Sequence, residues 1–186
     1  MIIDRELLKP TIFELGKYLG IKYNMQMGPA YVPNLETAQK TGLNCAALAH
    51  LINEEVYGIK LPDDLGPVEW WLDSRYSRFL DQNEELRAGD VAFFGKSDTN
   101  PQLIPDSIKD DPLAVRAYIK RYPAHHLAVY IGQSVDYQPL FIHSSYAIGG
   151  VAIWMEDQFY NYRSSKGSTP YGILHGLKRT NSLRGG

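Results

Sequence analysis

The sequence predicts one α+β domain, in which helices near the N-terminus pack on an antiparallel β-sheet. Most helical patterns fall within the first 80 residues, and short segments rich in β-branched and aromatic residues follow from residue 90 onward. Helices first and strands afterwards are typical of an α+β domain. A chain of 186 residues is also long enough to bury about two-thirds of the surface that it exposes when unfolded. We therefore expect a single domain over residues 1–186.

The N-terminal part of the chain is predicted to hold one helix followed by a loop. Leucines and aromatic residues recur at helical spacing from Pro10, a residue type favoured at helix starts, to Gly20. Residues 21–40 are rich in Gly, Pro, Asn and Tyr, which predicts an ordered loop.

The clearest helical pattern begins at Cys45, the only cysteine of the chain. Apolar residues recur from there at the spacing of one helix face, and Gly58 supplies an end signal. Asn44 is a favoured N-cap residue, so Cys45 is predicted to be the first residue inside the helix. A further helical piece is predicted over residues 66–80.

The second half of the chain is predicted to supply the sheet. Five segments bounded by Gly, Pro, Asp or Ser are expected to be strands: residues 90–95, 126–132, 139–145, 150–155 and 171–180. About 30 residues separate the first two strands, which is long for a simple connection. We therefore expect an insertion at about residues 96–124, with a short helix inside it.

Charge and motif content argue against several classes of protein. The chain has 19 Lys and Arg against 21 Asp and Glu, without a long run of one sign, so neither nucleic acid nor an anionic membrane surface is an expected partner. No segment approaches the roughly 20 apolar residues of a membrane span, and charges interrupt the N-terminal apolar residues, unlike in a signal peptide. The localisation stays open between the cytoplasm and export by a route that reads no signal peptide.

No metal or other cofactor is expected, because the chain has no H-E-x-x-H motif and no acidic cluster at ligand spacing.

Cys45 has two interpretations. A single cysteine forms no intramolecular disulfide, and on an apolar helix face it is more often a buried space-filler. A helix start, however, lowers the pKa of a thiol, because unpaired N–H groups and the aligned dipole stabilise negative charge there. The catalytic interpretation needs a histidine within reach and a third group that orients this histidine.

The histidines differ in how they can serve Cys45. His50 lies on the same helix, about 140° around its axis, and is expected at the surface or half-buried. His126 falls at the start of a predicted strand, on the face opposite the aliphatic side chains. His143 lies in the next strand, where antiparallel pairing can bring the two imidazoles together. His175, in the last strand, is expected to be structural.

Four blocks, in this order, resemble the NlpC-type cell-wall cysteine peptidases of the papain-like class: GLNCAALAHLINEEVYGIKLP, EELRAGDVAFFG, HLAVYIG and FIHSS...GGVAIW. They cover roughly residues 41–155. The resemblance implies a papain-like fold, with the nucleophile helix on an antiparallel sheet of about five or six strands. It implies that Cys45 is the nucleophile, His126 its base and His143 the group that orients His126. Tyr31 is similar to a family tyrosine near the oxyanion site, where the backbone N–H of Cys45 is the other donor.

Two features depart from the family pattern. Asn44 and two alanines flank Cys45 where the family has D-C-S-G, so a carboxylate and a hydroxyl are lost. In the family the acidic residue helps to receive the free amine of the substrate, and a different specificity is therefore expected. The insertion at about residues 96–124 leads directly into the strand of His126, where it either walls the cleft or decorates the surface.

The expected activity is that of a bacterial cysteine peptidase or amidase, which hydrolyses an amide bond through a thioester on Cys45. The resemblance implies a peptide or a peptidoglycan fragment as substrate, with cleavage in the stem peptide. Two alternatives stay open: an acyltransferase or transpeptidase that uses the same thioester, and a catalytically inactive binding domain. If the chain is a secreted effector, an immunity or inhibitor protein is a further expected partner.

Overall fold

The computed structural model describes residues 12–25, 32–63, 65–95, 107–108, 110–111, 113–114, 124–163 and 171–181. Over these residues the helices are α1 (Ile12–Gly16), α2 (Leu35–Thr41), α3 (Cys45–Glu55), α4 (Pro67–Leu72) and α6 (Glu156–Asn161), with a 3-10 turn η2 (Tyr146–Ile148). The strands are β1 (Ser77–Phe79), β2 (Val91–Gly95), β3 (Ala124–Gln133), β4 (Pro139–Ser145), β5 (Gly150–Met155) and β6 (Ile173–Thr180).

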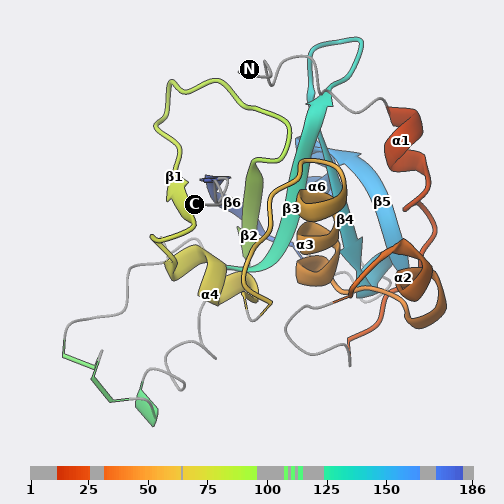
Figure 1. Cartoon of the computed structure of the whole chain (residues 1–186). Helices are drawn as coiled ribbons and strands as arrows, with labels where there is room; N and C mark the ends of the chain where they lie inside the picture. The colour runs from red at the N-terminus through yellow and green to blue at the C-terminus, as the bar shows by residue number, and fades with distance from the viewer. Residues whose placement is uncertain are drawn as a thin grey trace, which may run out of the picture.

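The strands form one antiparallel sheet, on which the N-terminal helices pack (Figure 1). Within the described residues it has six strands in the order β1-β6-β2-β3-β4-β5. The α+β prediction is confirmed, and the five predicted strands correspond to β2 through β6. α3 contacts β3 and β4, which are the strands that carry His126 and His143.

The helical piece predicted over residues 66–80 is wrong in its second half, because α4 ends at Leu72 and β1 follows. The carboxylate of Asp73 accepts a hydrogen bond from the backbone N–H of Tyr76 at 2.8 Å, which turns the chain. The amine of Lys178, buried in β6, donates to three backbone carbonyls at the end of α4. A side chain from the far end of the sequence thus closes this helix, and no local pattern predicts it.

The loop predicted over residues 21–40 is also wrong in part, because α2 forms at its end. The side chain of Asn34 accepts a hydrogen bond from the backbone N–H of Thr37 at 2.9 Å, as an N-cap does. Gly42, with a φ of 83°, follows the last turn. These start and stop signals are local, and they outweigh the loop-like composition around them.

Two other helices differ from expectation. α1 ends at Gly16, short of the predicted end at Gly20, and the predicted start at Pro10 lies outside the described residues. α6 has six residues, of which Phe159 is buried, so it is too short for a periodic pattern.

Most of the insertion at about 96–124, with its predicted helix, lies outside the described residues. None of the described helices is both long and apolar enough to cross a membrane.

The two faces of the sheet carry different cores. On the α3 side, alternate residues of β2, β3 and β4 join the helices in a core that is mainly aliphatic. On the other side, Phe94, Phe141 and Tyr130 of the sheet pack with Phe159 of α6 and with Tyr171. The second core is therefore largely aromatic, and it is the one that surrounds the histidine pair.

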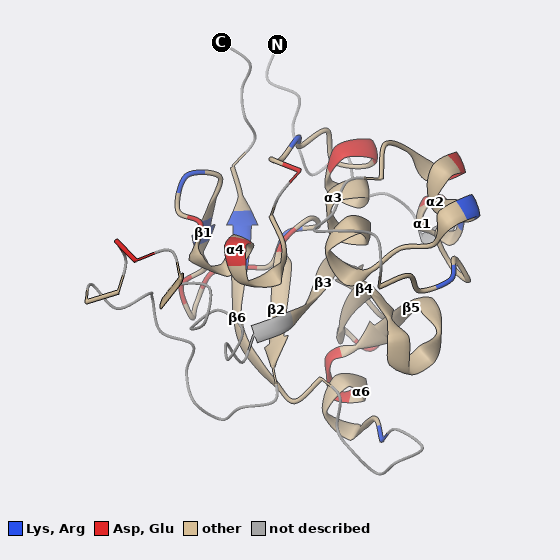
Figure 2. Cartoon of the chain, turned by 90° about the horizontal axis from the view of Figure 1, so that it is seen from below, with Lys and Arg blue, Asp and Glu red and all other residues tan. Residues whose placement is uncertain are grey.

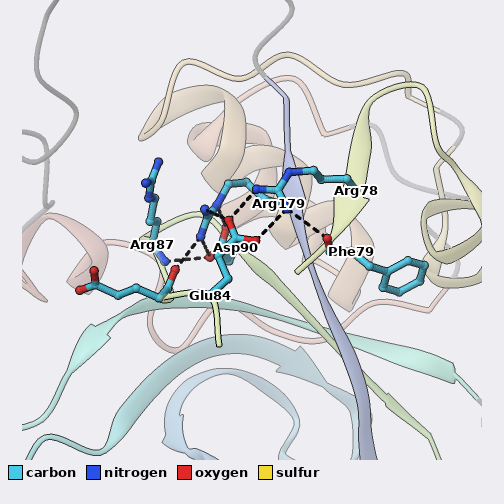
Figure 3. A network of polar contacts seen from close by, with 7 residues as sticks. Arg78, Phe79, Glu84, Arg87, Asp90 and Arg179 are labelled. Carbon is cyan, nitrogen blue, oxygen red and sulfur yellow. Dashed lines mark hydrogen bonds and ion pairs between the residues drawn. The ribbon is translucent and has the colours of Figure 1, made fainter. Parts of the chain in front are cut away.

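A charged network, drawn in Figure 3, fastens the opposite part of the sheet. Arg179 of β6 donates to both carboxylate oxygens of Asp90, at 2.9 and 2.8 Å, and to Glu84 at 2.5 Å. Arg78 of β1 forms two further bonds to Glu84. The network joins β1 and β6 to the segment that leads into β2, so it holds one edge of the sheet together.

Candidate active site

The turn before Cys45 is fixed by backbone contacts with residues 22–24. The N–H of Leu43 donates to the carbonyl of Lys22 at 2.9 Å, and the N–H of Asn24 donates to the carbonyl of Leu43 at 3.1 Å. A Cβ on Gly42 would lie 2.7 Å from the carbonyl oxygen of Lys22, and its φ of 83° is also one that favours glycine. The close approach of two chain segments therefore requires glycine two residues before the N-cap.

Asn44 caps α3 as the sequence predicts. Its side-chain oxygen accepts a hydrogen bond from the backbone N–H of Ala47 at 2.8 Å. Cys45 is the first residue of the helix, and the helix has no acidic residue in its first turn. The nucleophile candidate thus sits among backbone N–H groups, with a neutral amide in place of the carboxylate found in the NlpC-type pattern.

Ser144 and Ser145, at the end of β4, bind the turn before Cys45 and the aromatic core respectively. Ser144 donates from its hydroxyl to the carbonyl of Leu43 at 2.7 Å, and both residues are buried. Ser145 accepts a hydrogen bond from the hydroxyl of Tyr171 at 2.7 Å on the aromatic side. Because neighbouring strand residues point to opposite faces, β4 is tied to the cysteine turn on one side and to the aromatic core on the other.

Cys45 is half-buried where the start of α3 meets the start of β3. The backbone of Leu127, Ala46 and Cys45 itself offers hydrogen bonds that favour the ionised sulfur. Burial raises the pKa of the thiol, and these hydrogen bonds oppose the rise without reversing it. The direction is opposite to the one predicted from the helix start, because the sheet removes the sulfur from solvent.

The two strand histidines lie in contact, as antiparallel neighbours predict. Nε2 of His126 is 3.1 Å from Nδ1 of His143, and the two rings stand at 90°. Both side chains are buried, and His143 is fully so. The next residue after His126 is Leu127, whose backbone reaches the sulfur of Cys45. The structure thus gathers Cys45, His126 and His143 at one end of β3 and β4.

The imidazole of His143 is enclosed by aromatic rings. Trp154, Phe159 and Tyr171 lie with ring centroids 4.6, 4.7 and 5.5 Å away. Burial lowers the pKa of His143 to about 3, so it stays neutral at pH 7. Within the described residues its Nε2 has no hydrogen bond partner. In the described part of the chain, the hydrogen bond of this neutral imidazole is to His126, so His143 is suited to orient that ring.

Two tyrosines near Cys45 were not singled out by the sequence patterns. Burial raises the pKa of Tyr23 and, to about 12, that of Tyr171, and negative charge on Cys45 raises both further. Tyr171 also packs against His126, with ring centroids 4.8 Å apart. Neither tyrosine has a motif around it, and only its long-range neighbours reveal its place.

The remaining candidates are placed as follows. Tyr31 lies outside the described residues, so its oxyanion role stays a prediction. The expectation of a surface or half-buried His50 is wrong, because its side chain is buried beside Trp70 and its Nε2 lies 2.9 Å from the carbonyl of Leu65. His175 packs near Trp71. Among the described residues, no group of three or more His, Cys, Asp and Glu is arranged to hold a metal ion.

Comparisons with protein-family models, curated proteins and solved structures find no match to this chain. A functional interpretation therefore depends on the ordered sequence blocks and on the geometry of the site.

Proposed function

We propose that this chain is a cysteine peptidase or amidase of papain-like fold, with Cys45 as nucleophile, His126 as base and His143 as the group that orients His126. One observation carries the proposal. His126 lies 3.1 Å from His143, and the backbone of the next residue, Leu127, interacts with the sulfur of Cys45. Cys45 and His143 are 98 residues apart in the sequence, and the nearness of both to the start of β3 supports the roles that thiol hydrolysis needs.

The proposed roles require one particular pair of tautomers, and both keep His143 neutral. With its proton on Nε2, His143 accepts at Nδ1 a hydrogen bond from Nε2–H of His126. His126 then carries its lone pair on Nδ1, the nitrogen that takes a proton from the thiol. Because burial raises the thiol pKa, the resting form is a protonated Cys45, and proton transfer accompanies the attack.

The chemistry then runs in two halves. The sulfur of Cys45 bonds to the amide carbon, and the carbonyl oxygen becomes an oxyanion that the backbone N–H at the start of α3 stabilises. The C–N bond breaks as His126 returns the proton to the amine, which leaves a thioester. Water gives a proton to His126 and attacks the thioester carbon, so that a carboxylic acid and the thiol are released.

The substrate class follows from the resemblance to NlpC-type peptidases. Peptidoglycan stem peptides are the proposed substrates, and the bond cleaved is an amide within the stem. The neutral Asn44, which is already engaged as a helix cap, supports a specificity unlike that of relatives with a carboxylate there. If the chain acts as a secreted effector, the proposal includes an immunity or inhibitor protein as its partner.

Incubation of the protein with purified muropeptides, followed by mass spectrometry, tests this function. The wild type is expected to release a shortened stem peptide, with the mass of one water added across the two products. Cys45→Ala is expected to release none. Products that carry an added amine or alcohol in place of water indicate acyl transfer through the same thioester. Intact stem peptides after prolonged incubation with every muropeptide contradict the proposal.

A further inference from the structure

Tyr146 is a large aromatic side chain left in solvent next to the site. It follows Ser145 directly and opens the turn η2, between β4 and β5, and it is 77% exposed. Exposed aromatic rings forgo the free energy of burial, so one beside a catalytic strand suggests a surface that a ligand covers.

Tyr23 lies between Tyr146 and the turn that precedes Cys45. The two tyrosine rings meet edge to face, with centroids 6.0 Å apart at 71°. The backbone of Tyr23 forms an isolated parallel β-bridge with Leu43. Burial raises the pKa of the Tyr23 hydroxyl, and negative charge on Cys45 raises it further. Tyr23 is half-buried and Tyr146 exposed, so the pair extends from the neighbourhood of the thiol out to the surface.

Among the described residues, the segments that carry Tyr146 and the catalytic candidates are uncharged. Residues 41–53, 124–135 and 139–155, which build the described part of the site, contain no Asp, Glu, Lys or Arg. Figure 2 shows the ribbon of β4 and β5 in tan, with charged residues on α2 and at the start of α6. Lys22 precedes Tyr23 in an extended segment, so its exposed side chain points to the other side. A charged substrate group would meet no counter-ion on these segments, whereas an apolar face gains from contact with the rings.

We infer that Tyr146, supported by Tyr23, is a specificity-determining residue that binds an uncharged, C–H-rich face of the substrate beside the scissile amide. A sugar ring attached to the stem peptide and an aliphatic side chain within the stem both offer this chemistry. The inference rests on the proposed function for the identity of the substrate. It adds the chemical character of the group that the enzyme selects next to the bond that it cleaves.

Binding to a protein that cannot turn over separates this inference from the proposed activity. Cys45→Ala is titrated by calorimetry with a disaccharide-tetrapeptide and with the same tetrapeptide lacking sugar. Adding Tyr146→Ala is expected to weaken binding of the disaccharide-tetrapeptide by about tenfold, as loss of an aromatic contact does. Tyr146→Phe is expected to bind as tightly as the parent, because the ring makes the contact.

Tyr137→Ala is the matched control. Tyr137 is 80% exposed and precedes β4, whereas Tyr146 follows it, so the two tyrosines lie at opposite ends of the same strand. This control is expected to leave both affinities unchanged. A loss confined to the disaccharide ligand identifies a sugar ring, and an equal loss on both ligands identifies an aliphatic side chain. Equal affinities of the Tyr146→Ala and Tyr137→Ala proteins, or no binding of either ligand to Cys45→Ala, overturn the inference. Binding that responds to Tyr146, with no cleavage by the wild type, contradicts only the proposed hydrolysis.

Discussion

Two buried polar clusters lie on the same sheet and differ in how their groups are satisfied. The histidine cluster, His126 with His143, is enclosed by aromatic rings and leaves a buried nitrogen without a hydrogen bond partner among the described residues. The arginine cluster, Arg179 with Asp90 and Glu84, pairs opposite charges through bidentate contacts (Figure 3). The first is neutral and lies beside a thiol, whereas the second is charged and lies at the edge formed by β1 and β6.

Both clusters perturb pKa values, so a shifted pKa alone does not mark a functional site. A hydrogen bond from Arg78, with the charge of Arg179, lowers the pKa of Glu84 to about 2. Burial lowers the pKa of His143 to about 3. In the arginine cluster the shift accompanies fully paired charges, which stabilise the fold. In the histidine cluster the shift accompanies a buried nitrogen that has no hydrogen bond partner among the described residues. Such a nitrogen destabilises the fold, and it is expected where the imidazole has a catalytic role. The two clusters should therefore respond differently to substitution.

The largest effect is expected from His126→Ala. Loss of a general base lowers the rate of hydrolysis by about 10²- to 10⁴-fold. The substitution also leaves Nδ1 of the buried His143 without its partner, so the rate is compared per folded molecule. Muropeptide cleavage and thermal unfolding, measured on the same preparation, separate the effect on the rate from the effect on stability. Activity above a tenth of the wild-type value contradicts the assignment of the base.

Arg179→Met is expected to lower stability and to leave the rate of hydrolysis unchanged. The side chain of Arg179 is 12% exposed and that of Asp90 is 2% exposed, so the substitution leaves a nearly buried carboxylate without its partner. The expected loss of stability is about 3 kcal/mol in urea unfolding, with unchanged activity per folded molecule.

Arg78→Met is the matched control for Arg179→Met, because Arg78 also binds Glu84 but is 49% exposed. A surface pair of this kind contributes about 0–1 kcal/mol. Equal losses of stability in the two variants would remove the distinction between a buried and an exposed member of the cluster.

The pH dependence of stability provides a third contrast. The folded-state pKa of His143 is about 3, below its ordinary value of 6.5, so between these pH values the unfolded chain binds one more proton than the folded chain. Stability from this residue is present above pH 6.5 and is lost as the pH falls toward 3. Wild type is therefore expected to lose about 2 kcal/mol more than His143→Gln between pH 6 and pH 4. Urea unfolding at both pH values measures the difference, and parallel curves for the two proteins contradict a neutral buried imidazole.

The smallest effect is expected from Ser144→Ala, which removes the hydrogen bond to Leu43. The expected loss of stability is about 1 kcal/mol. Because the bond holds the turn before Cys45, kcat is expected to fall by about tenfold with little change in KM. Ser145→Ala, on the other face of β4, is the comparison variant. A change in stability without a change in kcat would assign Ser144 to the fold alone.

Local signals in the sequence predict much of this arrangement. The cap at Asn44, the helix that starts at Cys45 and the five strands follow from residue types and spacing that act over a few residues. The alternation along β3 also places His126 on the face away from the aliphatic core, because strand side chains point to opposite sides in turn. Where local signals are weak, as in α6, or compete with a loop-like composition, as in α2, the prediction fails.

The sequence by itself determined which residues were available for thiol chemistry and on which elements they lie. Only the tertiary structure decided that Ser144 holds the turn at Leu43 across 101 residues, and that Tyr23 and Tyr171 lie near enough for charge on Cys45 to raise their pKa values. It also reversed the expected direction of the thiol pKa. Burial and long-range contacts depend on how the strands pair and on where α3 meets the sheet, and the periodicity of one segment carries no information about either.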